Sequence, residues 1–243
     1  GNIENMNGYI EKIESLVMSR GNSQQKSRYF TDILQLSVRR KRYRLDPDDT
    51  EIAKKSLSYA NQTNDISLQA FGCFALGFTL YFNDLFLESI AELEYGLVKF
   101  ERSNSVASKC RFTIYMSIAY RRCMDVENTK KYAVTALNLA TKAARQDYVA
   151  AANANLAWVA YKSNEDIRSM ELIKLSKHLW ESIKDEYPFP FQWLSLIIEL
   201  ELLVNDNIKK GGWQDEIVRI ATALMSESQQ ILPALINKNL ETF

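Results

Sequence analysis

The sequence contains few of the residues that interrupt regular secondary structure. Among its 243 residues are 8 glycines and 4 prolines, and these two residue types are the main breakers of helices and strands. The Asn-Gly turn that joins paired strands is missing as well, because Asn7-Gly8 lies in a helix-like segment without alternating strands beside it. Long helices joined by short turns are therefore the predicted structure.

Residues for the common catalytic and metal sites are also scarce. His178 is the only histidine, and the cysteines, Cys73, Cys110 and Cys123, are too dispersed for a metal cluster. An odd number of cysteines without a disulfide framework is typical of a reducing compartment. Glycine-rich phosphate-binding motifs and nucleophile motifs do not occur. We therefore expect no enzymatic activity, no cofactor, no metal and a cytoplasmic location.

The chain has no excess of either charge, with 30 Lys+Arg and 30 Asp+Glu residues. Only a local patch would attract nucleic acid, and the run RRKRYR between Arg39 and Arg44 is the strongest one. We favour a helix C-terminus, where the helix dipole stabilises cations and the acids of DPDD follow directly. A nucleic-acid-binding helical repeat that uses this run is retained as an alternative.

One uncharged stretch approaches the length of a membrane span. Eighteen residues without charge lie between Asp65 and Asp84. They include Ser67, Gln69 and Asn83, and acids rather than lysine or arginine flank them. A helix buried on most sides within a helical array explains this composition better, so we expect no membrane span.

The chain resembles itself in three segments that begin at Leu76, Met116 and Ala157. Each segment has a helix-like stretch with a small and an aromatic residue, a turn with an aspartate, and a second stretch with small or apolar residues at positions i, i+4 and i+7. The aspartates recur at intervals of 41 residues, at Asp84, Asp125 and Asp166. Repeated two-helix units are typical of a solenoid.

This pattern resembles the tetratricopeptide repeat, in a long-period variant of about 41 residues similar to repeats in regulatory regions of bacterial signalling proteins. The residues that carry the resemblance are Gly77, Ser117 and Trp158 at the glycine position, Leu80, Tyr120 and Tyr161 at the tyrosine position, and Ser89, Thr129, Gly96 and Ala136 in the second helices. The third copy departs from the pattern, because Trp158 is bulky and Lys177 replaces the last small residue.

The resemblance implies an all-α fold, a right-handed α-solenoid of about five antiparallel helical hairpins. Residues 1–243 are expected to form a single helical-repeat domain, with clear repeats at about 70–185 and divergent capping hairpins at 1–64 and 189–243. The implied function is a non-catalytic scaffold that binds a protein or peptide, as the partner-docking or sensing part of a bacterial regulatory protein.

The first helices of such repeats line a concave groove, and among the residues at the family's groove positions we expect eight to bind the partner. They are Phe74, Phe78, Tyr81, Arg111, Arg121, Arg122, Asn155 and Lys162. The cationic side chains would bind an acidic partner, and Asn155 its backbone. Packing against a neighbouring helix is the alternative explanation for the aromatic residues. Self-association into a homodimer through the apolar segments 193–204 and 231–243 also stays open.

Overall fold

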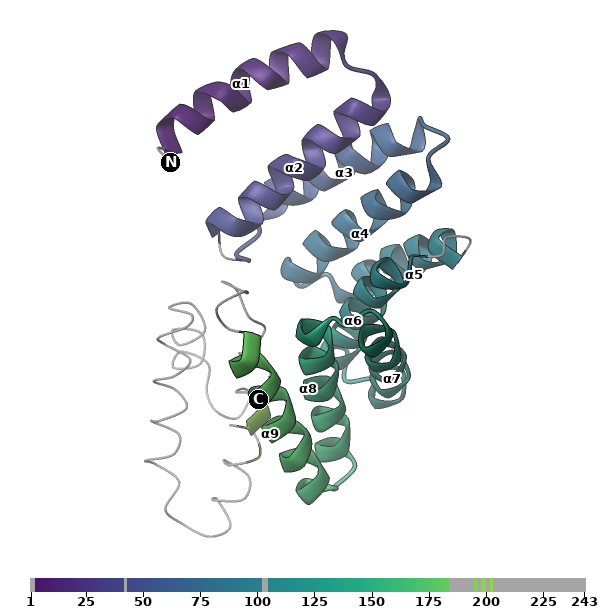
Figure 1. The fold of residues 1–243 in the computed structure, drawn as a ribbon. Helices are drawn as coiled ribbons and strands as arrows, with labels where there is room; N and C mark the ends of the chain where they lie inside the picture. The colour runs from purple at the N-terminus through teal and green to yellow at the C-terminus, as the bar shows by residue number, and fades with distance from the viewer. Residues whose placement is uncertain are drawn as a thin grey trace. The chain divides into compact units, whose positions relative to one another are not determined.

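The computed structural model describes residues 3–41, 43–101, 105–183, 195, 198, 199 and 202. All the regular structure in this part of the chain is helical, as predicted (Figure 1). The helices are α1 (Ile3–Arg20), α2 (Ser23–Lys41), α3 (Pro47–Asn61), α4 (Ile66–Phe82), α5 (Phe86–Glu101), α6 (Val106–Arg122), α7 (Val126–Lys142), α8 (Gln146–Lys162) and α9 (Asp166–Ile183).

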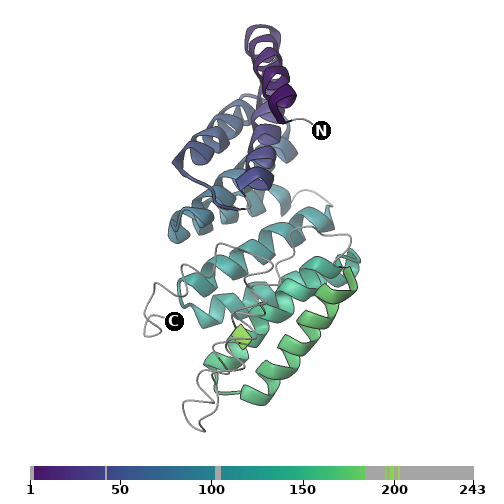
Figure 2. The same cartoon turned by 90° about the vertical axis from the view of Figure 1, so that its left-hand side faces the viewer.

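The chain divides into two compact units, with the boundary in the sequence between Met124 and Asp125. In the N-terminal unit each helix from α1 to α5 packs against the next one in the chain, and α4 also contacts α2 and α6. In the C-terminal unit α8 packs against both α7 and α9 (Figure 2). The predicted single domain and its right-handed superhelix stay predictions, and most of the predicted hairpin at 189–243 lies outside the described residues.

Equivalent positions recur every 40 residues from α2 to α9. The second helices of the four copies each have a fully buried residue at this interval, namely Ala53, Leu93, Ala133 and Ile173. Left-handed backbone conformations occur at the same interval in the turns, at Asp84, Met124 and Asn164. The α2–α3 pair, predicted as a divergent cap, therefore follows the same register as the later copies.

The spacing of 41 residues between aspartates is consequently not the period of the structure. Asp84 is the left-handed residue of its turn, Asp125 is the N-cap of α7, and Asp166 is the first residue of α9. Aspartate is favourable at each of these three positions, so its recurrence did not fix the register. With a period of 40, the small sites of the last copy are Ala157 and Ser176, both fully buried.

Side-chain caps explain where several helices begin. The carboxylates of Asp65 and Asp125 accept hydrogen bonds from the backbone N–H groups of Leu68 and Asn128, at 3.0 and 2.9 Å. Such caps satisfy N–H groups that have no partner within the helix. Each of these aspartates therefore fixes both the start of a helix and the exit of the preceding turn.

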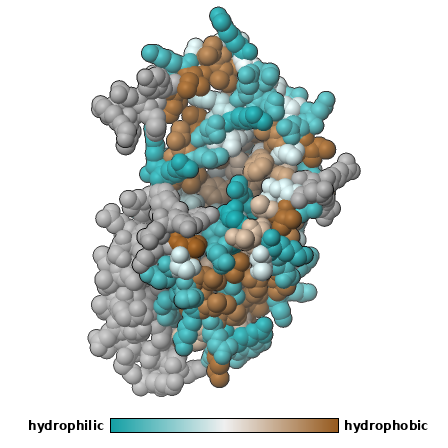
Figure 3. All heavy atoms as spheres, viewed as in Figure 1, coloured by the Kyte–Doolittle hydropathy of each residue, from teal (hydrophilic) through white to brown (hydrophobic). Residues whose placement is uncertain are grey.

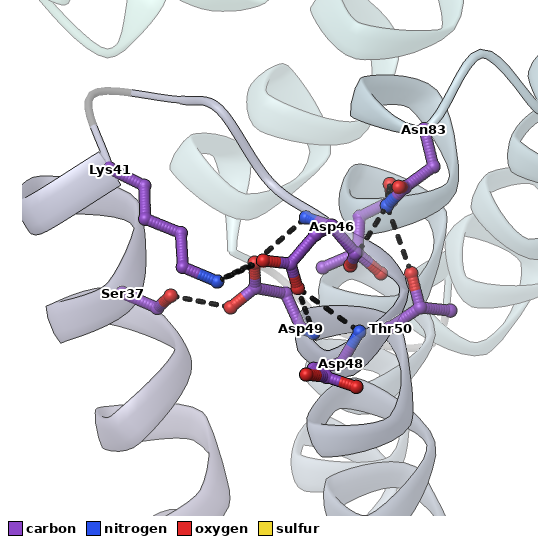
Figure 4. A network of polar contacts seen from close by, with 8 residues as sticks. Ser37, Lys41, Asp46, Asp48, Asp49, Thr50 and Asn83 are labelled. Atoms are coloured by element: carbon purple, nitrogen blue, oxygen red, sulfur yellow. Dashed lines mark hydrogen bonds and ion pairs between the residues drawn. The ribbon is translucent and has the colours of Figure 1, made fainter.

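A polar network fixes the turn between α2 and α3 (Figure 4). The Lys41 ammonium lies 2.6 Å from Asp46 Oδ2 and 2.8 Å from Asp49 Oδ2. The Ser37 hydroxyl donates to the buried Asp49 carboxylate, and Asn83 Nδ2 donates to the Asp46 carbonyl at 3.2 Å. The network therefore joins the ends of α2 and α4 to the start of α3.

The uncharged stretch that approached the length of a membrane span forms α4. This helix packs against α2, α3, α5 and α6, and ten of its residues are buried. Its composition thus follows from its central position in the N-terminal unit. In the part of the chain that the structure describes, no helix is both long and apolar enough to cross a membrane.

Candidate binding surface

Four phenylalanines form a row along one side of α4, at Phe71, Phe74, Phe78 and Phe82. This set is called the aromatic row. The ring centroids of Phe74 and Phe78 are 5.9 Å apart, and those of Phe78 and Phe82 are 4.8 Å apart. Phe78 is buried, whereas the other three members of the row are half-buried. The row is therefore partly core and partly surface.

Aromatic side chains of two other segments hold the row in place. Tyr43, which follows α2, lies 5.3 Å from the Phe82 ring. Phe112 and Tyr115 of α6 pack edge-on against Phe74, at centroid distances of 5.3 and 5.4 Å. Such edge-to-face pairs stabilise ring positions beyond the burial of area alone. The row is thus a preformed surface, which a ligand would not have to order.

A cation lies over the start of the row. The Arg111 guanidinium of α6 is 5.8 Å from the Phe71 ring centroid and 5.5 Å from that of Phe74. Cation–π contacts of this kind orient the flat guanidinium group, which can also bind a carboxylate through two parallel hydrogen bonds. The surface therefore combines apolar contact area with a site for an acidic group.

The other copies show that the helical packing does not require this row. The four positions are Thr31, Leu34, Val38 and Arg42 in the first copy, Arg111, Ile114, Ile118 and Arg122 in the third, and Ala151, Ala154, Trp158 and Lys162 in the fourth. Phenylalanine occupies all four positions in α4 alone. The row is therefore a special property of the second copy.

Solved structures share the architecture of this chain. It is similar to the apo form of RapI, with a TM-score of 0.70 and 10% identity over 89% of this chain and 75% of that one. It is also similar to BtubC (BKLC) from P. vanneervenii, with a TM-score of 0.63 and 12% identity over 88% and 87% of the two chains. The fold is a helical repeat. No protein-family model and no curated protein sequence matches the chain, and the two likenesses bear on the fold alone.

The eight predicted groove residues of this helical repeat fall into both compact units. The N-terminal unit holds Phe74, Phe78, Tyr81, Arg111, Arg121 and Arg122, and the C-terminal unit holds Asn155 and Lys162. Within the first group, Phe74 and Arg111 are half-buried and Arg122 is exposed. These three combine surface access with a place beside aromatic rings, whereas Tyr43 was not predicted because it lies in a turn without periodic signal.

The neighbouring residues Arg121 and Arg122 have opposite environments. Arg121 is buried near Tyr81, which is itself buried. Burial raises the pKa of Tyr81, and the nearby charges of Arg121 and Arg122 oppose this increase. Arg122 is exposed, with its guanidinium 4.9 Å from the Phe86 ring and 3.6 Å from Asp84 Oδ1. Of the two, only Arg122 is placed to meet a partner.

Asn155 and Lys162, in α8, differ in the same way. Asn155 is fully buried and donates from Nδ2 to the Ala151 carbonyl at 3.2 Å. Lys162 is half-buried, with its ammonium 5.1 Å from the Tyr161 ring. A side chain without exposed surface does not reach a partner's backbone, so Asn155 has no part in the proposal below.

The basic run lies at the end of α2. Arg39, Arg40 and Lys41 form the last turn of that helix, in line with the preference of cations for helix C-termini. Lys41 forms ion pairs with Asp46 and Asp49, which reduces the net positive charge of the run. Within the described ranges, no group of three or more His, Cys, Asp and Glu side chains is arranged to hold a metal ion.

Proposed function

We propose that the protein is a non-catalytic binding scaffold and that its N-terminal unit binds a peptide or protein segment along the aromatic row. The observation that supports this function is that three members of the aromatic row on α4 are half-buried, at positions where the other copies have no aromatic residue. Aromatic residues and arginine are enriched at the energetic centres of protein interfaces. By the resemblance of its repeat pattern, the scaffold belongs to the docking or sensing part of a bacterial regulatory protein.

The arrangement of cations defines the ligand further. Arg111 and Arg122 are both on α6, three turns apart on one side of the helix, and therefore separated by about 16 Å along its axis. An extended peptide rises about 3.3 Å per residue. The preferred ligand is thus an extended segment with two acidic residues about five positions apart and apolar or aromatic side chains between them.

A displayed library of random peptides tests this function without knowledge of the natural partner. The library is selected on the whole chain, and the enriched peptides are measured by fluorescence anisotropy. Two variants probe the surface, Phe71→Thr, which introduces the residue of the first copy, and Arg111→Gln. Arg28→Gln is the matched control, because Arg28 is an exposed arginine of α2 outside the row.

Selected peptides should carry the spaced acids and the apolar residues described above. We expect them to bind the wild type and Arg28→Gln equally and each of the two surface variants at least about tenfold more weakly, since interface centres carry most of the binding energy. Equal affinity for all four proteins would exclude the aromatic row as the binding surface. Failure to enrich any peptide would contradict the proposed function as a whole.

A further inference from the structure

Helix α5 exposes a line of apolar side chains. Leu87, Tyr95 and Val98 have 72, 57 and 61% of their surface exposed, and Ala91 between them is exposed as well. Positions 87, 91, 95 and 98 lie along one side of a helix. These four residues are called the outer stripe. The buried side of α5, which includes Leu93 and the other core positions, faces α4 and α6.

Exposed apolar residues are common in folded proteins, and a single one does not indicate a binding surface. Figure 3 shows hydrophobic residues at several places on one face of this molecule. The internal repeat offers a sharper test, because the same four positions occur in the other second helices. They are Pro47, Glu51, Lys55 and Ser58 in α3, Glu127, Lys131, Thr135 and Asn138 in α7, and Ile167, Glu171, Leu175 and His178 in α9.

The comparison separates the outer stripe from the requirements of the fold. α3 and α7 carry charged and polar residues at most of these positions, yet they bury the equivalent core residues Ala53 and Ala133 just as α5 buries Leu93. Four uncharged apolar or aromatic residues at this place are found in α5 alone among the copies. A contiguous apolar line that the core does not need indicates a contact with another molecule.

The charges beside the outer stripe indicate the chemistry of that molecule. Glu88 and Glu94 are exposed and Glu92 is half-buried on the same helix. Burial raises the pKa of Glu92. Lys99 is the cation nearest the stripe on α5, with its ammonium 4.7 Å from the Tyr95 ring and 2.9 Å from Gln69 Oε1.

The part of α5 beside the outer stripe is therefore predominantly acidic. Glu94 accepts a hydrogen bond from the Tyr120 hydroxyl at 2.8 Å, which holds its carboxylate in place. A second copy of this chain on the same surface would bring glutamate against glutamate, and like charges across an interface oppose association. A partner with cations beside an apolar face is complementary in both respects.

We propose that the outer stripe is a second docking surface, which receives an amphipathic helix of another protein with lysine or arginine beside its apolar face. The apolar side chains of the two helices would interdigitate as in ordinary helix packing. The glutamates would pair with the cations at the rim, where complementary charges contribute to specificity and association rate. This surface does not involve the aromatic row, and the proposal does not depend on the peptide-binding function.

Designed peptides provide the test. The probe is a labelled helical peptide with leucines along one face and lysines on its flanks, measured by fluorescence anisotropy on the whole chain. One companion peptide has glutamate in place of each lysine, and another has the same composition in scrambled order. The first variant carries the residues of α7 in the stripe, Leu87→Glu, Tyr95→Thr and Val98→Asn.

A charge variant and a matched control complete the design. The charge variant, Glu88→Asn with Ala91→Lys, also takes its residues from α7 and leaves the three large apolar side chains in place. The control, Ile167→Glu with Leu175→Thr, makes the same kind of exchange in α9. Because the altered residues are exposed, circular dichroism should show similar melting temperatures for all these proteins.

The lysine peptide should bind the wild type and the α9 control alike. Each α5 variant should bind it at least about tenfold more weakly, and the glutamate and scrambled peptides should show no saturable binding. Equal binding of the lysine peptide to all variants, or its failure to bind the wild type, would overturn the proposal. A wild-type dimer in sedimentation velocity that the α7-type exchange dissociates would overturn it too, because the occupant would then be a second copy of the chain.

Discussion

The hydroxyl group of Ser89 donates a hydrogen bond to the backbone carbonyl of Gly77, 2.6 Å away, and thereby joins α5 to α4. The equivalent bond between Ser169 and Ala157 joins α9 to α8 at 2.7 Å. Small residues at the two acceptor positions let the paired helices approach. A Cβ atom on Gly77 would lie only 2.8 Å from Leu93 Cγ. The same kind of hydrogen bond therefore joins the two helices in both hairpins.

Loss of this contact should destabilise the protein measurably. Ser89→Ala removes a fully buried hydrogen bond, and we expect the free energy of unfolding in urea to fall by about 1 to 2 kcal/mol. Ser58→Ala is the matched control, because Ser58 is exposed on α3, and it should change the value by less than about 0.5 kcal/mol. Equal effects of the two substitutions would show that the contact contributes nothing.

The small residues at these contacts are the part of the fold that the sequence predicted best. The internal repeat and helical spacing identify Gly77, Ser89 and Gly96, because close helix approach admits few residue types. The last copy is misaligned by one residue in the sequence prediction, which assigns Trp158 to the glycine position of the repeat. In the structure Ala157 occupies that position. The reason is physical: an aspartate suits several positions around a turn, whereas the buried small residue fits only one.

The candidate surface was predicted less completely than the fold. The groove positions implied by the resemblance include Phe74, Phe78 and Arg111, which lie next to one another in the structure; their contact with a partner stays a prediction. These positions did not separate Arg121 from Arg122, because a difference in burial between adjacent residues depends on the position of Tyr81 in another helix. Spacing also gave no warning that Asn155 would be fully buried. Such distinctions arise from tertiary packing.

Charge reversal should distinguish the two arginines on α6. Arg121→Glu replaces a buried cation near the buried Tyr81 with a carboxylate, so we expect a loss of about 3 kcal/mol or more in the free energy of unfolding. Arg122→Glu loses only an exposed pair with Asp84, and its effect should stay below about 1 kcal/mol. Chemical denaturation followed by circular dichroism measures both. Similar stability of the two variants would contradict the buried position of Arg121.

The network at the α2–α3 turn should behave as a buried contact (Figure 4). Asp49→Ala deprives Ser37 and Lys41 of their shared carboxylate. We expect a cost of about 2 to 4 kcal/mol, because the Asp49 side chain is almost fully buried. Glu51→Ala breaks the exposed pair with Lys54 instead and should cost less than about 1 kcal/mol. A cost for Asp49→Ala as small as that of this control would show that the network contributes little to the stability of the protein.

The three thiols should react at different rates in the folded protein. Cys73 and Cys110 are buried, and Cys123 is half-buried. Burial, assisted by the charge of Glu92, raises the pKa of Cys73 to about 12, so its reactive thiolate form is rare at neutral pH. A chromogenic disulfide reagent should therefore modify Cys123 first, and Cys123→Ser should abolish the fast phase. Fast modification of Cys73 in the native protein would contradict its burial.

The N-cap of α7 should make stability depend on pH. The Asn128 side chain and backbone donate hydrogen bonds to the Asp125 carboxylate, and they lower the pKa of this group in the folded state. A group with a lowered folded-state pKa stabilises the protein above its unfolded pKa of about 4, and this contribution is lost as the pH falls through the folded-state value. Acid should therefore weaken the cap.

Substitution of Asp125 isolates this effect. Asp125→Ala should cost about 1 kcal/mol at pH 7, as for other N-caps. Asp125→Asn keeps an acceptor at the cap but does not ionise, so the wild type should lose stability relative to this variant between about pH 5 and pH 2. Urea unfolding at a series of pH values measures the difference between the two proteins. If that difference were the same at both ends of the series, the ionised carboxylate would have no special role in the cap, and a neutral oxygen that accepts from the Asn128 backbone N–H would start α7 equally well.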